Sequence, residues 1–222
     1  MTRKYKAAIF DFDGLIIDTE SPWFEIYQEI YARFGQSLTA DQWSAYVGTH
    51  DPNHDWYTAL APHIGQGISR AALRAEADAL HKARMEKADL RPGVLDYLEA
   101  AQELGLSIGL ASSSTASWVL PFLDRHGLRE RFQTICTADD VLRVKPDPAL
   151  YMLACQRLGV APSDAIAFED SPNGAKAAKT AGLACVVVPN GLTADYAFDA
   201  HDWRLASMAD MAFATLLQNL QR

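Results

Sequence analysis

Cysteine is scarce in this chain, whose 222 residues include only Cys136, Cys155 and Cys185. The three are widely spaced, odd in number and form no Cys-x-x-Cys pair, which disfavours both a disulfide framework and a zinc knuckle. We therefore expect each thiol to be a small core residue in a reducing compartment.

Long apolar runs and blocks of like charge are also missing. No segment approaches the length that spans a membrane, and Asp11 interrupts the first apolar run too early for a signal peptide. With a net charge of -8, most of the surface would repel the backbone of a nucleic acid or an anionic membrane. We predict a cytoplasmic monomer with no nucleic acid or membrane partner.

The chain does contain enough hydrophobic residues, 49% of the total, for one large core or for a core and a smaller domain. From residue 90 onward, short apolar runs alternate with helical segments, which indicates a parallel sheet covered on both faces. The predicted fold class is therefore α/β, with a Rossmann-like parallel sheet. The expected strands are the apolar runs at residues 7–10, 106–111, 134–136, 165–168 and 184–188.

A different pattern separates the first two strands. Four helical segments follow one another without a strand between them, which does not fit simple β-α-β alternation. We predict an inserted all-helical domain at residues 16–87, within a core formed by residues 1–15 and 88–222. The last helix of that core is expected to begin after Ser207. The predicted starts of the four inserted helices are Ser21-Pro22, a capping box of Thr39 with Gln42, Asp51-Pro52, and Ser69.

Polar side chains follow several of the predicted strands. Asp11 and Asp13 come after the first, and period-two geometry would put both on the same side of an extended backbone. Ser112-Ser113-Ser114, Lys145 and Glu169-Asp170 follow later segments. Because ligands bind at the carboxyl ends of parallel strands, the fold would bring these residues into one pocket. Such a set suits a divalent cation, a tetrahedral anion and an aspartate nucleophile.

Each of these residues also has an ordinary structural explanation. Ser112 could cap a turn or helix, Lys145 could be a solvated loop residue, and Glu169-Asp170 could complement the dipole of the helix that follows. Their occurrence together, at matching strand ends, favours the functional interpretation.

The same residues resemble the motifs of the haloacid dehalogenase superfamily of hydrolases, in the branch that has a helical cap inserted after the first strand. The similarity covers nearly the whole chain. The matching motifs are Asp11-Phe12-Asp13-Gly14 with Asp18-Thr19-Glu20, Ala111-Ser112, Lys145-Pro146-Asp147-Pro148, and Phe168-Glu169-Asp170-Ser171 with Asn173-Gly174.

This resemblance implies a Mg2+-dependent phosphatase. Asp11 would attack phosphorus and form an aspartyl-phosphate, while Asp13 would protonate the leaving alcohol and then activate water. Family members that attack carbon lack the second aspartate, so Asp13 argues for phosphate chemistry. The residues implied to hold the metal are Asp11, Asp13 through its backbone carbonyl, and Asp170, with Glu169 as a ligand or a neighbour of one. Those implied to bind the phosphoryl group or substrate are Ser112, Ser113, Lys145 and Asn173.

In this family the cap selects the leaving group. A cationic face on the fourth predicted helix could meet an acidic or phosphorylated substrate, with Arg74 and His81 as binding candidates. A solvated face balanced by nearby acidic residues is the alternative. An apolar side formed by Leu73 and Leu80 would lie beside it. The cationic residues that share one arc of this helix are Arg70, Arg74, His81 and Arg84.

The predicted substrate is a small phosphorylated metabolite, for which a sugar phosphate is the leading choice. The enzymatic alternative is a phosphomutase of the β-phosphoglucomutase type. Trp23 and Asp51 stand where that mutase has a histidine and an arginine, which weakens this alternative. A non-catalytic phosphate-binding regulatory protein is the alternative of another class, and the intact pair of Asp11 and Asp13 argues against it because binding alone needs no nucleophile.

Overall fold

The computed structural model describes residues 5–46, 56–65 and 67–220. The chain divides into two compact units, one formed by Met1–Asp18 with Leu90–Arg222 and the other by Thr19–Asp89. In the described part of the chain, no helix is both long enough and apolar enough to cross a membrane.

The first unit contains a parallel sheet with a Rossmann-like arrangement, which confirms the predicted fold class. Six strands are described, in the order β3-β2-β1-β4-β5-β6. The last of them was not predicted, because a two-residue strand carries no apolar run that the sequence could reveal. The strands are β1 (Ala7–Phe10), β2 (Ser107–Ala111), β3 (Thr134–Cys136), β4 (Ala165–Glu169), β5 (Ala184–Val187) and β6 (Trp203–Arg204).

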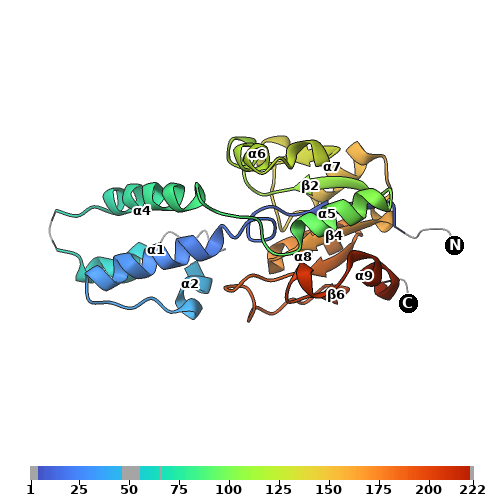
Figure 1. Ribbon diagram of the computed structural model, residues 1–222. Coiled ribbons are helices and arrows are strands. Elements are labelled where there is room, and N and C mark those ends of the chain that lie inside the picture. Colours follow the sequence, from blue (N-terminus) through green and yellow to red (C-terminus); the bar gives the residue numbers. More distant parts are fainter. Residues whose placement is uncertain (1–4, 47–55, 66, 221–222) are drawn as a thin grey trace. The chain divides into compact units, whose positions relative to one another are not determined.

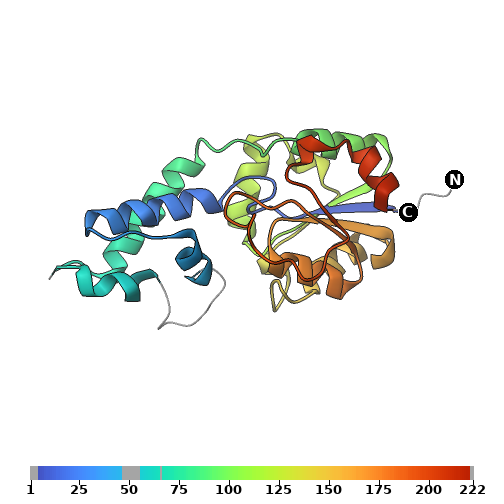
Figure 2. The ribbon, with the colours of Figure 1, turned by 90° about the horizontal axis from the view of Figure 1, so that it is seen from below.

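Helices cover both faces of this sheet, as Figure 2 shows for α5 and α9 on one side and α8 on the other. Side chains alternate along each strand, so Ile9 packs in a buried cluster with residues of α7 and α8. Phe10 faces the other way and stacks on Phe168 at 4.8 Å, and Phe168 contacts Tyr97 of α5. The helices of this unit are α5 (Val94–Glu103), α6 (Ala116–Arg125), α7 (Ala149–Leu158), α8 (Pro172–Ala181) and α9 (Phe213–Leu220).

The second unit is all-helical in the residues described (Figure 1). The predicted capping box is confirmed: the backbone N–H of Gln42 donates to Thr39 Oγ1 at 3.2 Å, and that of Thr39 donates to Gln42 Oε1 at 2.9 Å. Ser69 caps the fourth helix by accepting a hydrogen bond from the N–H of Ala72. The helices are α1 (Glu20–Arg33), α2 (Ala40–Tyr46), α3 (Trp56–Leu60) and α4 (Arg70–Met85).

Several predicted boundaries were wrong. The first inserted helix begins at Glu20 rather than after Ser21, and Pro22 is still tolerated because the first N–H groups of a helix have no intrahelical partner. Ser207 caps a short 3-10 turn, and α9 starts only at Phe213. The predicted helix start at Asp51-Pro52 lies outside the described residues.

Candidate active site

Two carboxylates extend from neighbouring strands on the same face of the sheet. Strands β1 and β4 pair so that Phe10 lies opposite Phe168. The next residues along these strands are Asp11 and Glu169, and alternation turns their side chains to the side on which Ile9 packs against α7 and α8. The pairing of two apolar strands therefore brings the two acids together.

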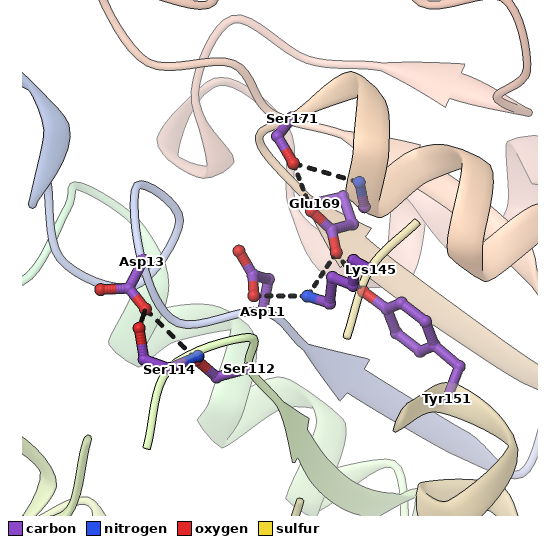
Figure 3. A network of polar contacts seen from close by, with 9 residues as sticks. Asp11, Asp13, Ser112, Ser114, Lys145, Tyr151, Glu169 and Ser171 are labelled. Carbon is purple, nitrogen blue, oxygen red and sulfur yellow. Dashed lines mark hydrogen bonds and ion pairs between the residues drawn. The ribbon is translucent and has the colours of Figure 1, made fainter. Parts of the chain in front are cut away.

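Lys145 lies between these acids, as Figure 3 shows. Its ammonium nitrogen is 2.5 Å from Asp11 Oδ1 and 2.6 Å from Glu169 Oε1, and all three side chains are at most 9% exposed. Tyr151 on α7 donates its hydroxyl hydrogen to the same oxygen of Glu169 at 2.5 Å. Burial lowers the pKa of Lys145, but the charges and hydrogen bonds of Asp11 and Glu169 outweigh this effect and raise it overall. The ammonium group is therefore held in its charged form.

The cluster carries more negative than positive charge. One oxygen each from Asp11, Glu169 and Asp170 lies within 4.8 Å of the others, and all three residues are buried. Burial, followed by the charge of Glu169, raises the pKa of Asp11 well above that of an ordinary carboxyl group despite the opposing effect of Lys145. A set of converging carboxylate oxygens with one ammonium group fits a hard divalent cation that would supply the missing positive charge.

Asp170 is fixed by residues that follow β5. Asn190 donates from Nδ2 to Asp170 Oδ2 at 2.8 Å, while its own Oδ1 accepts hydrogen bonds from the backbone of the following turn. Arg91 ties this region to the segment after β1 by donating to the carbonyls of Gly14, Val188 and Pro189. A side chain at position 14 would place its Cβ 2.0 Å from Asp170 Oδ2, so only glycine fits there.

Asp13 points to a different set of partners. Its Oδ2 accepts hydrogen bonds from Ser114 at 2.7 Å and Ser112 at 3.2 Å, and its Oδ1 accepts one from the indole N–H of Trp118 at 2.8 Å. Asp11 and Asp13 therefore have separate partners, Asp11 the ammonium group of Lys145 and Asp13 the serine hydroxyls, as Figure 3 shows. Strand β1 ends at Phe10 and the chain turns after Phe12, so the shared side of an extended backbone stays a prediction.

Helix α8 approaches Glu169 closely at its first turn. Ser171 caps this helix by accepting a hydrogen bond from the N–H of Gly174, and its hydroxyl also lies 3.4 Å from Glu169 Oε2. A Cβ atom on Gly174 would be 1.9 Å from that same carboxylate oxygen. The absence of a side chain at Gly174 therefore allows the first turn of α8 to approach the Glu169 carboxylate this closely.

The model of the family described as haloacid dehalogenase-like hydrolase matches residues 8–188. The chain belongs to this family. The match contains every side chain of the cluster described above.

The chain is also similar to individual members of the haloacid dehalogenase-like hydrolases. A protein of Bacillus subtilis (strain 168) named "Putative phosphatase YhcW" is 47% identical over 97% of each chain. Hexitol phosphatase B of Escherichia coli (strain K12) is 32% identical over 97% of this chain and 98% of its own. CbbY from Rhodobacter sphaeroides, whose crystal structure is a complex with phosphate, has a TM-score of 0.70 at 29% identity and covers 93% of this chain and 96% of its own.

The structure brings some of the predicted site residues of this hydrolase together and leaves others apart. Asp11, Lys145, Glu169 and Asp170 form one cluster, and Asp13 with Ser112 forms a second group beside β2. The side chains of Ser113 and Asn173 are exposed, the first after β2 and the second in the first turn of α8. Contact of these two with a substrate stays a prediction.

In the helical unit, His81 does not lie on an exposed cationic face. It is 3% exposed and stacks on Trp23 of α1 at 3.9 Å, with Nε2 3.1 Å from the carbonyl oxygen of Thr19. The guanidinium group of Arg74 lies over the same Trp23 ring, 4.9 Å from its centroid, and pairs with Asp78.

Helix α4 packs against α1, and its buried residues recur at every fourth position. Arg84 takes part in this packing, because it pairs with Glu25 and Glu29 of α1. Leu80 was wrongly placed on the apolar side and is 37% exposed. The buried residues of α4 are Leu73, Ala77, His81 and Met85.

Sequence reasoning missed four residues that support the cluster. Asn190 lies two residues after the predicted apolar strand at residues 184–188, so a slightly wider form of the rule that selected the other strand-end residues could have found it. Trp118, Tyr151 and Arg91 lie in or before helices and carry no comparable signal, because only the tertiary fold brings them to Asp13, Glu169 and Gly14.

Proposed function

We propose that this hydrolase removes the phosphoryl group from a small phosphorylated metabolite, with a sugar phosphate as the leading substrate class, through an aspartyl-phosphate on Asp11. The observation that carries the proposal is the buried contact of Asp11 with Lys145, beside a second aspartate that faces separate hydrogen-bond donors. This arrangement provides one carboxylate for attack and another for proton transfer. The similarity to hexitol phosphatase B supports the choice of substrate class.

We further propose that the site works with Mg2+. Asp11, Asp170 and the backbone carbonyl of Asp13 would hold the ion, while Glu169 is engaged by Lys145 and Tyr151 and would act through them. The bound ion would neutralise the dianionic phosphate, which otherwise repels an aspartate nucleophile.

The protein's own residues divide the reaction into two proton-balanced steps. A carboxylate oxygen of Asp11 attacks phosphorus, the ester P–O bond breaks, and the departing oxygen takes the proton of Asp13. Water then attacks the same phosphorus and gives a proton to Asp13, and the P–O bond to Asp11 breaks with its electron pair returning to the carboxylate. Lys145 and Ser112 would hold the non-bridging oxygens in both steps.

We propose the helical unit, which is inserted between β1 and β2, as the cap that selects the leaving group. The phosphomutase alternative needs a group that recognises a second phosphate in this unit. Trp23 stacks on His81, also contacts Arg74 and has no acid or base group, while Asp51 lies outside the described residues.

Phosphorus NMR of the enzyme with a panel of sugar and hexitol phosphates tests the proposal. We expect inorganic phosphate as the main product, no requirement for a bisphosphate activator, and loss of turnover when EDTA removes the metal. Conversion of glucose 1-phosphate to glucose 6-phosphate with negligible free phosphate, in the presence of glucose 1,6-bisphosphate, would establish the mutase instead. Absence of any turnover would favour the regulatory alternative.

A further inference from the structure

We propose that Trp118 is a positioning residue for Asp13, which it holds by one oxygen so that the other oxygen transfers the proton. This inference rests on the proposed function, because it assigns a supporting group to the acid of that reaction. Trp118 itself would touch neither the phosphoryl group nor the leaving group.

Among the residues that the structure describes, the hydrogen-bond donors to the Asp13 side chain come from the segment after β2 and from the first turn of α6. Trp118 lies in the first turn of α6 and donates from Nε1 to Oδ1 at 2.8 Å. Ser112 and Ser114 donate to Oδ2 at 3.2 and 2.7 Å. The two carboxylate oxygens therefore have different kinds of neighbours.

This difference assigns the two oxygens different tasks. An indole N–H can only donate, whereas a hydroxyl group can donate or accept. A proton on Oδ1 would have to share that oxygen with the indole donor, while a proton on Oδ2 can be accepted by a serine hydroxyl that has rotated. Oδ2 is thus the oxygen that can carry the proton. The hydrogen bond from Trp118 to Oδ1 fixes the orientation of the carboxyl group and therefore the direction in which Oδ2 points.

Aromatic packing holds the indole in place. The Trp118 ring meets the edge of Phe122 at 4.8 Å, and Phe122 packs in turn on Phe12, the residue between the two aspartates. Helix α6 therefore contacts the segment around Asp13 twice, through the hydrogen bond from Trp118 to Asp13 and through the packing of Phe122 on Phe12. Only the polar contact reaches the carboxylate, and substitution can separate the two.

The activity of Trp118→Phe toward esters with different leaving groups distinguishes a role in positioning Asp13 from a merely structural role. We would measure kcat/KM for 2,4-dinitrophenyl, 4-nitrophenyl, phenyl and glycerol phosphates, because this constant includes only the steps up to departure of the leaving group. Dinitrophenolate leaves without a proton and should be affected by about twofold or less, whereas the alkyl ester should lose about tenfold or more. Phe122→Leu, which alters the same packing without touching Asp13, should lower all four values by a similar factor.

A second variant keeps the test valid if Trp118→Phe fails to fold. Replacement of Trp118 by β-(3-benzothienyl)alanine preserves the ring volume and puts sulfur where the N–H was, and the same graded loss is expected. An equal loss across the ester series, or no loss, in an enzyme that is otherwise active would overturn the role of Trp118 alone. A wild-type enzyme that hydrolyses none of the esters would instead contradict the proposed function, and with it the step that Trp118 serves.

Discussion

At the scale of single residues, Lys145 supplies the positive charge that offsets the buried carboxylates of the site. It is the ammonium group that contacts both Asp11 and Glu169, and its side chain is 5% exposed. Removing one member of such a buried set leaves the others as uncompensated charges, which costs more than the pair contributes when intact.

We therefore expect Lys145→Met to abolish turnover and to lower the free energy of unfolding by about 3 to 5 kcal/mol. The matched control is Lys179→Met, which breaks the ion pair with Asp202 at the surface and should cost less than about 1 kcal/mol. Urea unfolding and phosphate release would be measured on both. Full activity of the Lys145 variant would contradict the assigned site.

Asn190 allows a test of the proposed Mg2+ site that does not depend on turnover. Loss of its bond to Asp170 in Asn190→Ala should weaken Mg2+ binding about 10- to 100-fold, the usual effect of removing a group that orients a metal ligand. Isothermal titration with Mg2+ would measure this, with Asn219→Ala on α9 as the control. Equal affinities for wild type and Asn190→Ala would show that Asp170 needs no such support.

Residue identities could be predicted from the sequence wherever a polar side chain directly follows an apolar strand. Asp11, Glu169 and Asp170 were found in this way and lie together. Lys145 lies further from the third predicted strand, at residues 134–136, but belongs to the motif Lys145-Pro146-Asp147-Pro148 and lies with them. Tyr151 could not be found, because an aromatic residue in an apolar helix gives no sign that its hydroxyl reaches a buried acid.

At the scale of secondary-structure elements, the first turn of helix α8 packs closely against the carboxylate of Glu169. Alanine normally stabilises a helix by up to about 1 kcal/mol relative to glycine. At position 174 the steric effect should dominate, because the added Cβ would overlap the Glu169 carboxylate.

Gly174→Ala should therefore lower both the melting temperature and the activity, although it replaces a poor helix former with the best one. The control is Gly65→Ala in the helical unit, where no atom lies within 4 Å of the added Cβ and a change within about 0.5 kcal/mol is expected. Thermal unfolding of both variants measures the difference. A Gly174 variant at least as stable and active as wild type would disprove the close approach of α8.

Helix starts were predicted well where a side chain caps the helix by bonding to a backbone group nearby in sequence. Ser69 and the pair of Thr39 with Gln42 cap helices as expected, because these bonds span only three residues. Strand β6 and the start of α9 were missed, since they depend on contacts with distant segments rather than on local pattern.

At the scale of the whole molecule, the strand-helix alternation was sufficient to predict a parallel α/β unit with a helical insertion. It could not predict which hydrogen-bond donors each acid meets after its strand ends, such as the hydroxyl of Ser114 at Asp13 and the ammonium group of Lys145 at Asp11. It also could not predict that the charged stripe of α4 contains a histidine packed inside the helical unit. Monomeric state and cytoplasmic location stay predictions.

The central claim is that Asp11 carries the phosphoryl group during turnover. The most direct test is rapid acid quenching of the enzyme with 2,4-dinitrophenyl phosphate, followed by mass spectrometry of the peptide that contains Asp11. We expect this peptide to carry one phosphoryl group in wild type, to accumulate it in Asp13→Asn because the second step is slowed, and to lack it in Asp11→Asn. Phosphate release by Asp11→Asn at the wild-type rate, or a phosphoryl group trapped on another residue, would contradict the account.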